Sequence, residues 1–300
     1  MAERVLVTGA SGLIGRAVVR GLRATGVCAI EVVSIERPGA ESETIVADLL
    51  ETASRRKALE QANADCLLHL AWHSDPKSRW TSPENFAWAQ ATIDLASEFR
   101  ILGGERAIFA GSCAEYGWQV SKLSEKSPLT PQTVYGQSKV IACREIERLS
   151  ELTGLSSAWG RIFFCYGPGE PKGRLLGDLI RGLLEKKTVA CTDGEQSRDF
   201  LYVDDVATAL LSVLSSRLNG PVNIGSGSAI KVREIIETVG DLIGHPELID
   251  RGRIQRPVDD PDCIEADVTL LKSTGFTTKW GLMDGLRKTV DETARSLQAE

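Results

Sequence analysis

A tyrosine and a lysine stand four residues apart in the segment Tyr135-Gly136-Gln137-Ser138-Lys139. On a helix, this spacing places both side chains on one face. A phenol has an ordinary pKa of about 10 and is a poor acid or base at neutral pH, but a neighbouring ammonium stabilises its anion. The pair therefore suits proton transfer to and from an alcohol or a ketone. Because the same spacing is frequent by chance, its meaning depends on the surrounding elements.

Ser112 closely follows the apolar run 106–110, which predicts a strand. A serine hydroxyl at a strand end can hydrogen-bond the oxygen on which a tyrosine acts. We therefore expect Ser112, Tyr135 and Lys139 to form one catalytic centre.

The first predicted strand, 4–9, leads into a glycine-rich turn and a helix. Such a turn lets the backbone approach a diphosphate, and the N–H groups at the helix start face the phosphates. An ordinary strand–helix turn is the alternative, but the position at the opening of a βαβ unit favours a dinucleotide site. The residues expected to contact the dinucleotide here are Gly9, Ser11, Gly12, Leu13, Ile14 and Gly15.

Two residues near the end of the second predicted strand make opposite demands on the cofactor. Glu36 would hold the adenosine ribose hydroxyls and favour NAD, whereas Arg37 would attract a 2′-phosphate and favour NADP. Both could also be solvated loop charges, so the expected cofactor is NAD or NADP. Asp48 and Leu49 follow the third strand and are expected to contact adenine, with capping of the next helix as the alternative for Asp48.

Strand-length apolar runs alternate with helical patterns along the chain, which predicts parallel βαβ units. The fold class is therefore α/β, a Rossmann-type doubly wound parallel sheet with a smaller C-terminal α/β substrate lobe. We assign 1–168 to the dinucleotide-binding domain, with 198–225 returning to it, and 169–197 and 226–300 to the substrate-binding lobe. The predicted strands are 4–9, 29–35, 44–47, 65–70, 106–110, 156–164, 188–191, 198–203 and 222–225. The predicted helices span about 14–25, 83–102, 135–152, 174–186, 205–215, 231–243 and 284–298.

Together these segments resemble an extended short-chain dehydrogenase/reductase of the NAD-dependent epimerase/dehydratase family, whose members act on nucleotide sugars. The matching segments follow the family's order and are 8–15, 69–71, 112–117, 135–139, 161–169, 198–205 and 223–225. The resemblance implies that Tyr135 is the catalytic acid/base, that Lys139 binds the nicotinamide ribose and lowers the Tyr135 pKa, and that Ser112 positions the substrate oxygen. It also implies that Leu70 and Ala71 line the cofactor site.

The resemblance further implies a site for a nucleotide-diphosphate sugar. Arg198 and Arg256 match arginines that contact the diphosphate or the nucleotide, and a planar guanidinium suits bidentate phosphate binding. Arg174 is a further candidate, and a solvated surface position is the alternative for all three. Cys113 and Phe164 are also expected to contact the substrate.

Departures from the family pattern narrow the chemistry. Cys113 and Ala114 stand where family dehydratases carry an Asp-Glu pair, which disfavours a 4,6-dehydratase. Cys113 also lies one residue before the position of the cysteine in 3,5-epimerase/reductases, so we do not expect it to be an acid or base. Phe164 replaces a common Asn. His69 is expected to be structural, and His73 is a weaker candidate for substrate contact.

The first functional expectation is a 4-ketoreductase that reduces a keto nucleotide sugar, with Tyr135 as proton donor. The alternative is a 4-epimerase that uses the same residues with tightly bound NAD. A non-catalytic NAD(P)-binding regulator is the remote alternative, which the Ser112, Tyr135 and Lys139 set argues against. By analogy with the family, the chain is expected to form a homodimer through the helices 83–102 and 135–152.

Composition excludes several classes of protein. The net charge of −6 argues against nucleic acid as a partner, and no apolar run approaches the roughly 20 residues that span a membrane. Met1 leads almost directly into a strand, leaving no room for a signal peptide. The seven cysteines show no Cys-x-x-Cys spacing. We therefore expect a cytoplasmic protein without a metal site or disulfides.

Overall fold

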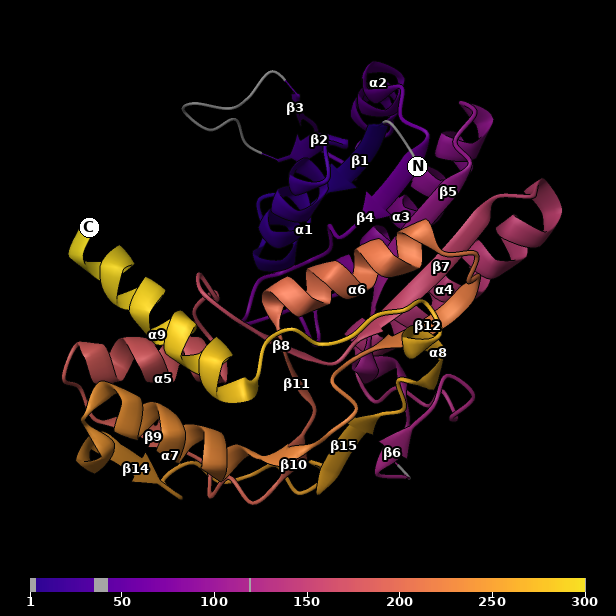
Figure 1. The fold of residues 1–300 in the computed structure, drawn as a ribbon. Helices are drawn as coiled ribbons and strands as arrows, with labels where there is room; N and C mark the ends of the chain where they lie inside the picture. The colour runs from indigo at the N-terminus through magenta and orange to yellow at the C-terminus, as the bar shows by residue number, and fades with distance from the viewer. Residues whose placement is uncertain (1–3, 35–42, 119, 300) are drawn as a thin grey trace.

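The computed structural model describes residues 4–34, 43–118 and 120–299, and its largest feature is a parallel sheet of seven strands. The strand order is β12-β7-β5-β4-β1-β2-β3, and every neighbouring pair is parallel. The order runs outward from β1 in both directions, as in a doubly wound fold. The strands are β1 (Arg4–Thr8), β2 (Cys28–Val33), β3 (Thr44–Val46), β4 (Cys66–His69), β5 (Arg106–Ser112), β7 (Ser156–Ile162) and β12 (Gly220–Ile224). The predicted α/β fold with a Rossmann-type sheet is confirmed (Figure 1).

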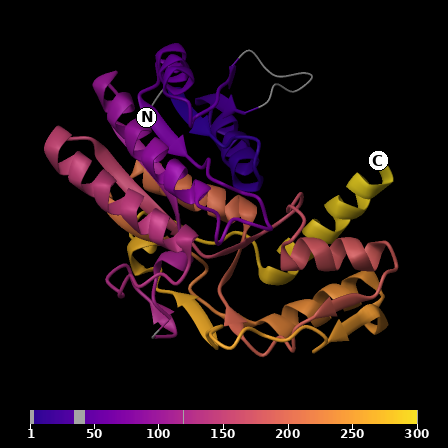
Figure 2. The same ribbon diagram turned by 180° about the vertical axis from the view of Figure 1, so that it is seen from behind.

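Helices cover both faces of this sheet (Figures 1 and 2). Side chains alternate along β1, so Val5 and Val7 pack in one hydrophobic cluster and Leu6 in the other. Because both faces are buried, the strands read as nearly continuous apolar runs. On one face lie α1 (Leu13–Ala24) and α6 (Val203–Ser215); on the other lie α2 (Thr52–Ala62), α3 (Glu84–Ile101) and α4 (Val134–Thr153).

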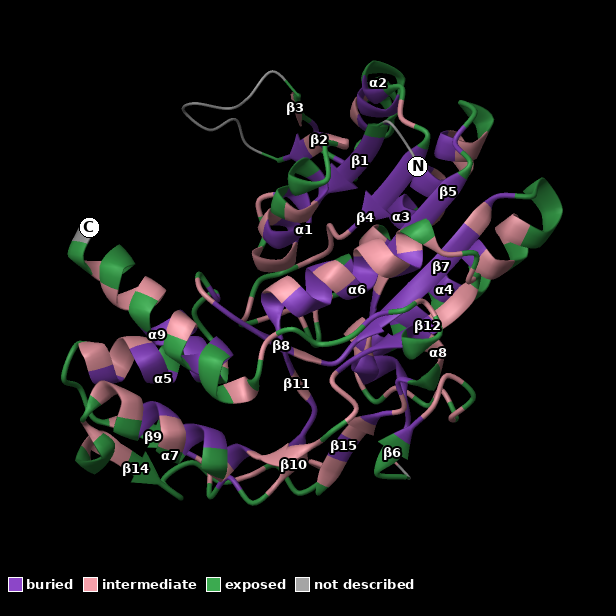
Figure 3. Ribbon diagram, viewed as in Figure 1, coloured by how far each residue is buried: buried purple, intermediate pink, exposed green. Residues whose placement is uncertain are grey.

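The second half of the chain builds a smaller lobe below the carboxyl ends of the strands in Figure 1. Its helices are α5 (Leu175–Leu184), α7 (Val232–Ile243), α8 (Thr269–Lys272) and α9 (Leu282–Ala299), with the short 3₁₀ helix η2 (Pro246–Leu248). Its strands are β9 (Val189–Cys191), β10 (Ser197–Arg198), β13 (Ile230–Lys231), β14 (Ile249–Arg251) and β15 (Cys263–Ala266), and β6 (Lys122–Leu123) pairs with β15. Figure 3 shows that the large sheet is buried while these helices keep exposed outer faces.

Two predicted strands are each divided in the structure, which corrects the sequence analysis. The run 156–164 ends its pairing in the large sheet at Ile162, and β8 (Phe164–Tyr166) pairs instead with β11 (Phe200–Tyr202). The run 198–203 is likewise divided between β10 and β11 at Asp199. The buried Asp199 carboxylate accepts hydrogen bonds from the backbone N–H groups of Ser226, Gly227 and Ala266 at 2.7, 2.9 and 3.0 Å. These bonds draw the backbone around the carboxylate and interrupt the extended run.

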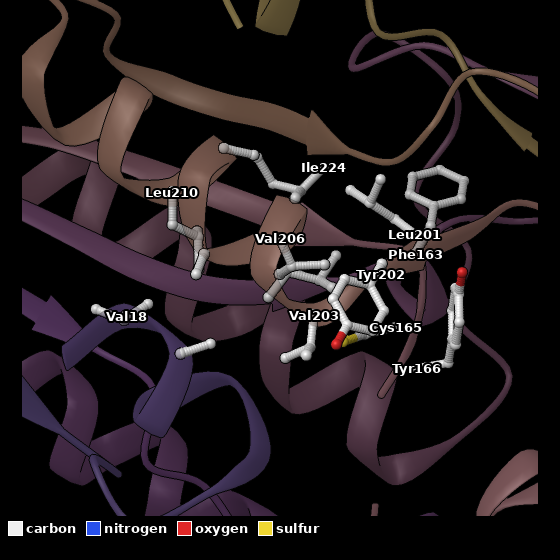
Figure 4. Packing of buried hydrophobic residues seen from close by; sticks show 14 of the residues in the cluster. Val18, Phe163, Cys165, Tyr166, Leu201, Tyr202, Val203, Val206, Leu210 and Ile224 are labelled. Carbon is white, nitrogen blue, oxygen red and sulfur yellow. The ribbon is translucent and has the colours of Figure 1, made fainter. Parts of the chain in front are cut away.

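The large sheet and the smaller lobe share a continuous hydrophobic core. Figure 4 shows Val206 and Leu210 of α6 near Ile224 of β12, with Tyr166 and Tyr202 continuing toward the smaller lobe. The rings of Tyr166 and Tyr202 contact each other edge to face, at a centroid distance of 5.6 Å. The core therefore fixes the position of the smaller lobe against the carboxyl edge of the sheet.

No described helix is long and apolar enough to cross a membrane. Within the described residues, no group of three or more His, Cys, Asp and Glu side chains is placed to hold a metal ion. The seven cysteines, all of which lie in the described ranges, are free thiols.

Candidate active site

Several of the predicted catalytic and cofactor-binding residues lie at the carboxyl ends of the central strands. Thr8, His69 and Ser112 are the last residues of β1, β4 and β5, three adjacent strands of the sheet. Ligand sites of open α/β sheets lie outside such strand ends. The structure therefore gathers side chains that are far apart in the sequence along one edge.

The three glycines of the turn meet different constraints. Gly9 has a φ of +68°, and a Cβ there would lie 2.7 Å from the Ala71 nitrogen. A Cβ on Gly15 would lie 2.1 Å from the Gly9 carbonyl oxygen, so Gly15 allows α1 to pack on the turn. A Cβ on Gly12 would meet only the Gly9 carbonyl oxygen, at 3.2 Å. Gly12 thus leaves open space above the turn, whereas Gly9 and Gly15 are required by the fold.

The start of α1 is free of competing groups. Gly12 is its N-cap, with no side chain to accept from the first N–H groups, and the first turn carries no acidic residue. Ser11, Leu13 and Ile14 are all half-buried beside it. The positive end of a helix dipole with uncapped N–H groups fits an anionic group such as the diphosphate of a dinucleotide.

Other predicted cofactor residues are placed less uniformly. Leu70 and Ala71 follow β4, and the Thr8 hydroxyl accepts from their N–H groups at 3.2 and 3.4 Å. Asp48 does not cap α2, because Glu51 does so with bonds to Ala53 and Ser54. The Asp48 carboxylate instead accepts from the Leu50 N–H at 2.9 Å.

Leu49, Glu36 and Arg37 complete the contacts predicted for the adenosine end of the cofactor. Leu49 is buried, and its carbonyl accepts from Arg55 at 3.0 Å. Glu36 and Arg37 lie outside the described residues. The choice between NAD and NADP that rests on them therefore stays a prediction.

Ser112, Tyr135 and Lys139 lie next to one another. Tyr135 is in the first turn of α4, whose N-cap Thr133 accepts from the Gly136 N–H at 3.1 Å. The Ser112 side chain is close enough to the Tyr135 phenol to lower its pKa. The Lys139 Nζ lies 5.8 Å from the centre of the Tyr135 ring and donates to the Ala110 carbonyl at 2.7 Å. The spacing of Tyr135 and Lys139 on one helix face thus brings both to the end of β5.

A buried ion pair lies behind this trio. The Glu115 carboxylate accepts from Arg161 at 2.8 Å, from the Trp159 indole at 2.8 Å and from the Ser112 backbone N–H at 2.7 Å. Both members of the pair are almost fully inaccessible to water. A Cβ on Gly111 would lie 2.6 Å from this carboxylate, so only glycine lets the strand pass it. Glu115 thus fixes the backbone that carries Ser112.

A second layer of hydrogen bonds holds the ion pair. Arg161 also donates to the Tyr116 phenol at 3.1 Å, and that phenol donates to the Asn223 side chain at 2.6 Å. Burial alone would lower the pKa of Arg161, but Glu115 and Tyr116 raise it above the ordinary value. Every charge in this layer is therefore paired. The sequence analysis included Glu115 in a matching segment without assigning it a role.

Trp72 is in direct contact with the Lys139 side chain. The Lys139 Nζ lies 3.5 Å from the centre of the Trp72 ring, a close cation–π contact. The Trp72 indole donates to the buried Asn85 side chain at 2.8 Å, which orients the ring. Trp72 and Trp80 both contact the Tyr135 ring edge to face, at 6.4 and 5.4 Å. Aromatic rings thus enclose the Tyr135–Lys139 pair.

Burial dominates the pKa values of this pair. It lowers the pKa of Lys139 to about 7, while the nearby Glu115 carboxylate opposes that shift. It raises the pKa of Tyr135 to about 12, while the Ser112 side chain opposes that shift. The phenol is therefore protonated at neutral pH in the protein alone, and any favourable positive charge near the ring would ease its ionisation.

His69 has the structural surroundings expected of it. Its Nδ1 and Nε2 lie 2.7 and 3.0 Å from the hydroxyls of Thr8 and Thr92. The Thr92 hydroxyl donates to the Trp88 carbonyl, so it accepts from Nε2–H and leaves Nδ1 to accept from Thr8. Burial, with a smaller contribution from Lys139, lowers the pKa of His69 to about 3. A neutral imidazole thus ties β1 to α3 under the site.

The predicted substrate residues form a group on the side of the smaller lobe. The Arg198 guanidinium lies 5.7 Å from the Phe164 ring and pairs with Asp260 at 2.5 Å. Arg256 pairs with the same carboxylate at 2.9 Å. Cys113 is buried. Burial and, to a smaller extent, the Glu115 carboxylate raise the pKa of its thiol to about 12. Its thiol is thus in the neutral form at neutral pH.

Arg174 and His73 stand apart from this group. Arg174 is the N-cap residue of α5, and its buried Nε has no hydrogen-bond partner among the described residues. His73 pairs with Glu84 at 2.8 Å and contacts the Ser78 hydroxyl. Arg79, which the sequence analysis missed, also has a buried Nε without a partner in the described part of the chain. In the sequence, Arg79 is one charged residue in a polar loop, and no motif or spacing marks it as a site residue.

Sequence comparison with known proteins agrees with the resemblance that the motifs indicate. The model of the NAD dependent epimerase/dehydratase family matches residues 5–225. The chain is 27% identical over 210 residues to an uncharacterized UDP-glucose epimerase, YtcB, of Bacillus subtilis, and the match covers 67% of this chain and 65% of that protein. It is 26% identical over 304 residues to a putative UDP-glucose 4-epimerase of Methanocaldococcus jannaschii, covering 96% of this chain and 97% of that protein.

A solved structure extends the likeness to three dimensions. MoeE5, in complex with UDP-glucuronic acid and NAD, is 33% identical and superposes with a TM-score of 0.87, over 98% of this chain and 99% of that one. The predicted resemblance is thereby confirmed along most of the sequence. The chain belongs to the NAD-dependent epimerase/dehydratase family.

Proposed function

We propose that this protein is a nucleotide-diphosphate-sugar 4-epimerase that works with tightly bound NAD. The observation that carries the proposal is the meeting of Ser112, Tyr135 and Lys139 beside an uncapped glycine turn. Relatives named as UDP-glucose 4-epimerases favour epimerisation over the 4-ketoreductase that the sequence analysis placed first. MoeE5 is known in complexes with UDP-glucuronic acid and with UDP-glucose, each with NAD. These complexes support a UDP-hexose or UDP-hexuronate as substrate.

The glycine turn would hold the dinucleotide. Its diphosphate would lie over Gly12, against the N–H groups of Leu13 and Ile14, with Ser11 beside them. Leu70 and Ala71 would line the cofactor site, and Lys139 would bind the nicotinamide ribose. Bound NAD supplies a reversible hydride acceptor for the sugar carbon.

Tyr135 would move the proton of the reacting hydroxyl. In its ionised form, which the positive charges of a protonated Lys139 and of bound NAD would favour, Tyr135 would take the proton from the sugar 4-hydroxyl. After the 4-keto sugar has turned over in the site, the same phenol would return a proton to the new hydroxyl. Ser112 would hold the reacting oxygen through a hydrogen bond. Lys139, on the same helix face, would stabilise the phenolate when its amine is protonated.

The group on the smaller lobe would bind the nucleotide end of the substrate. Arg198 and Arg256 both pair with the Asp260 carboxylate, and Arg256 also pairs with Asp262 at 3.0 Å. A diphosphate would bind beside these ion pairs through further guanidinium N–H groups. Phe164 would contact the substrate beside Arg198. Cys113 would contact the substrate through packing alone, because burial keeps its thiol neutral.

A homodimer through α3 and α4 fits their exposed surface. Phe86 and Ile101 of α3, and Ile141 and Leu152 of α4, are large apolar side chains left exposed. Exposed apolar side chains on two neighbouring helices suit a protein–protein contact. Cytoplasmic localisation stays a prediction from the sequence.

The test separates an epimerase from a reductase. Protein purified without added cofactor is denatured, and released NAD is quantified by chromatography; the native protein is then incubated with UDP-glucose and with UDP-glucuronate and followed by ¹H NMR. A 4-epimerase releases about one NAD per chain and forms the 4-epimer without added cofactor. Protein without bound NAD that forms product only with stoichiometric NAD(P)H and a keto sugar would establish the reductase instead.

A further inference from the structure

Two arginines from separate loops lie close together outside the group that holds Arg198. Arg79 is in the loop after β4, and Arg174 immediately precedes α5. The two loops are packed together, because a Cβ on Gly173 would lie 2.7 Å from the Pro76 side chain. The two guanidinium groups also interact electrostatically. Neither forms a hydrogen bond or an ion pair through its side chain with the described residues.

These arginines flank the tyrosine of the reaction centre. The Arg79 guanidinium lies 4.6 Å from the centre of the Trp80 ring, and that ring contacts Tyr135 at 5.4 Å. The Tyr135 backbone N–H donates to the Trp80 carbonyl at 3.3 Å. Arg79 and Arg174 are both within electrostatic reach of the Tyr135 phenol. Because Tyr135 works at the sugar ring, groups beside it face the sugar rather than the nucleotide.

The local charges do not balance. The Nε atoms of both arginines are inaccessible to water and have no partner among the described residues. A buried donor without an acceptor destabilises a protein. Glu170 interacts electrostatically with both arginines, and its carboxylate accepts from the Gly177 N–H at 2.7 Å. Burial raises the pKa of Glu170 to about 7, with Arg174 opposing, so this acid neutralises the two cations poorly below neutral pH.

We propose that Arg79 and Arg174 bind a carboxylate on the sugar ring, so that the substrate is a nucleotide-diphosphate hexuronate. This inference rests on the proposed function, because it places the sugar beside Tyr135. A planar carboxylate accepts from a guanidinium in a bidentate manner and would supply the negative charge that the two unpaired guanidinium groups lack. The diphosphate is assigned elsewhere, to Arg198 and Arg256. A neutral hexose would leave the two guanidinium groups without a counter-ion.

The test measures binding to the protein as purified, with its bound NAD. Titration calorimetry compares UDP-glucuronate, UDP-glucose and UDP on wild type, Arg79→Met, Arg174→Met and Arg79→Lys. Wild type is expected to bind UDP-glucuronate about tenfold or more tighter than UDP-glucose, the scale of one charge-assisted hydrogen bond. Each Met variant loses this preference, with much smaller changes for UDP-glucose and UDP, and Arg79→Lys keeps part of it. Arg148→Met, at an exposed position on α4, is the control and keeps the full preference.

Two outcomes would overturn the inference. One is equal affinity of wild type for UDP-glucuronate and UDP-glucose. The other is a loss in the Met variants that is the same for all three ligands, which would assign the arginines to the diphosphate. Should one Met variant not fold, the other Met variant and Arg79→Lys still decide the question.

The proposed function is tested separately by the NMR assay. Epimerisation of both sugars with equal affinities would keep the proposed function and remove this inference. Selective binding of UDP-glucuronate without epimerisation would keep the carboxylate site and remove the proposed 4-epimerase function.

Discussion

Arg161 and Arg79 both lie near the proposed reaction centre, the first buried and the second half-buried. Only Arg161 has a counter-ion among the described residues. Arg161 meets Glu115 at 2.8 Å and Tyr116 at 3.1 Å. Arg79 stacks on Trp80, and its Nε has no partner in the described structure. The first region is satisfied by the protein itself and sets the position of Ser112. The second region lacks a counter-ion for Arg79, which the proposed substrate would supply. The two regions therefore differ in whether the protein or the substrate provides the negative charge.

The largest expected effect is on the satisfied region. Glu115→Gln leaves Arg161 as a buried charge without its counter-ion, so unfolding in urea should show a loss of about 3–5 kcal/mol. Glu151→Gln removes an exposed pair with Arg148 and is the control, for which we expect little change. A fully stable Glu115→Gln protein would mean that the ion pair does not hold this layer together.

The glycine turn gives the same contrast between fold and ligand. Gly12→Ala should fold normally, because Gly12 has a φ of −74° and its Cβ would meet only one carbonyl oxygen at 3.2 Å. It should lose at least about tenfold in NAD affinity, since the new methyl group lies where the diphosphate is proposed to bind. Gly15→Ala should instead destabilise the fold, because its Cβ would lie 2.1 Å from the Gly9 oxygen. Calorimetry with NAD and thermal unfolding distinguish the two, and unchanged NAD affinity in Gly12→Ala would remove this turn from the proposal.

His69 provides a test by pH. Its pKa is about 3 in the folded protein and about 6.5 when unfolded, so between these values the unfolded chain binds one more proton. The contribution of His69 to stability is therefore present above pH 6.5 and is lost as the pH falls toward 3. In His69→Asn, the dependence of unfolding free energy on pH should be flatter by about 1.4 kcal/mol per unit between pH 6 and 4. Parallel curves for the two proteins would show that His69 is not buried in its neutral form.

The smallest expected effect is at the incomplete region. Arg79→Met loses a cation–π contact with Trp80 but also relieves repulsion from Arg174, so its unfolding free energy should stay within about 1 kcal/mol of wild type. The measurement is a urea titration without nucleotide sugar. A loss as large as that of Glu115→Gln would mean that Arg79 serves the fold, and the distinction between the two regions would fail.

The sequence predicts the sheet well because hydrophobic periodicity and glycine spacing are local signals. The strands that precede Gly9, Leu70 and Ser112 are found within one or two residues of their predicted ends. The divisions at Phe163 and Asp199 are not local. The first goes with the pairing of β8 with β11, and the second with backbone donors that approach Asp199 from 226–227 and 266. Pairing with distant strands therefore decides where these two runs end.

The candidate site divides in the same way. Tyr135 and Lys139 are detectable because one helix carries both. Glu115 and Trp72 contact partners far away in the sequence, and Arg79 comes near Arg174 only in the folded chain, so no spacing reveals them. An acidic residue three positions after Ser112, at the end of a buried strand, was the one usable signal for Glu115.

The central claim is that Tyr135 moves the proton of the reacting hydroxyl. The direct measurement is the rate of 4-epimer formation by ¹H NMR, with UDP-glucuronate and UDP-glucose, for wild type, Tyr135→Phe and the control Tyr202→Phe, which removes a buried phenol at the end of β11. The account predicts that Tyr135→Phe retains bound NAD and nucleotide-sugar affinity but turns over about 10²–10⁴-fold more slowly, whereas Tyr202→Phe keeps its activity. Tyr135→Phe with the turnover of wild type would contradict the account.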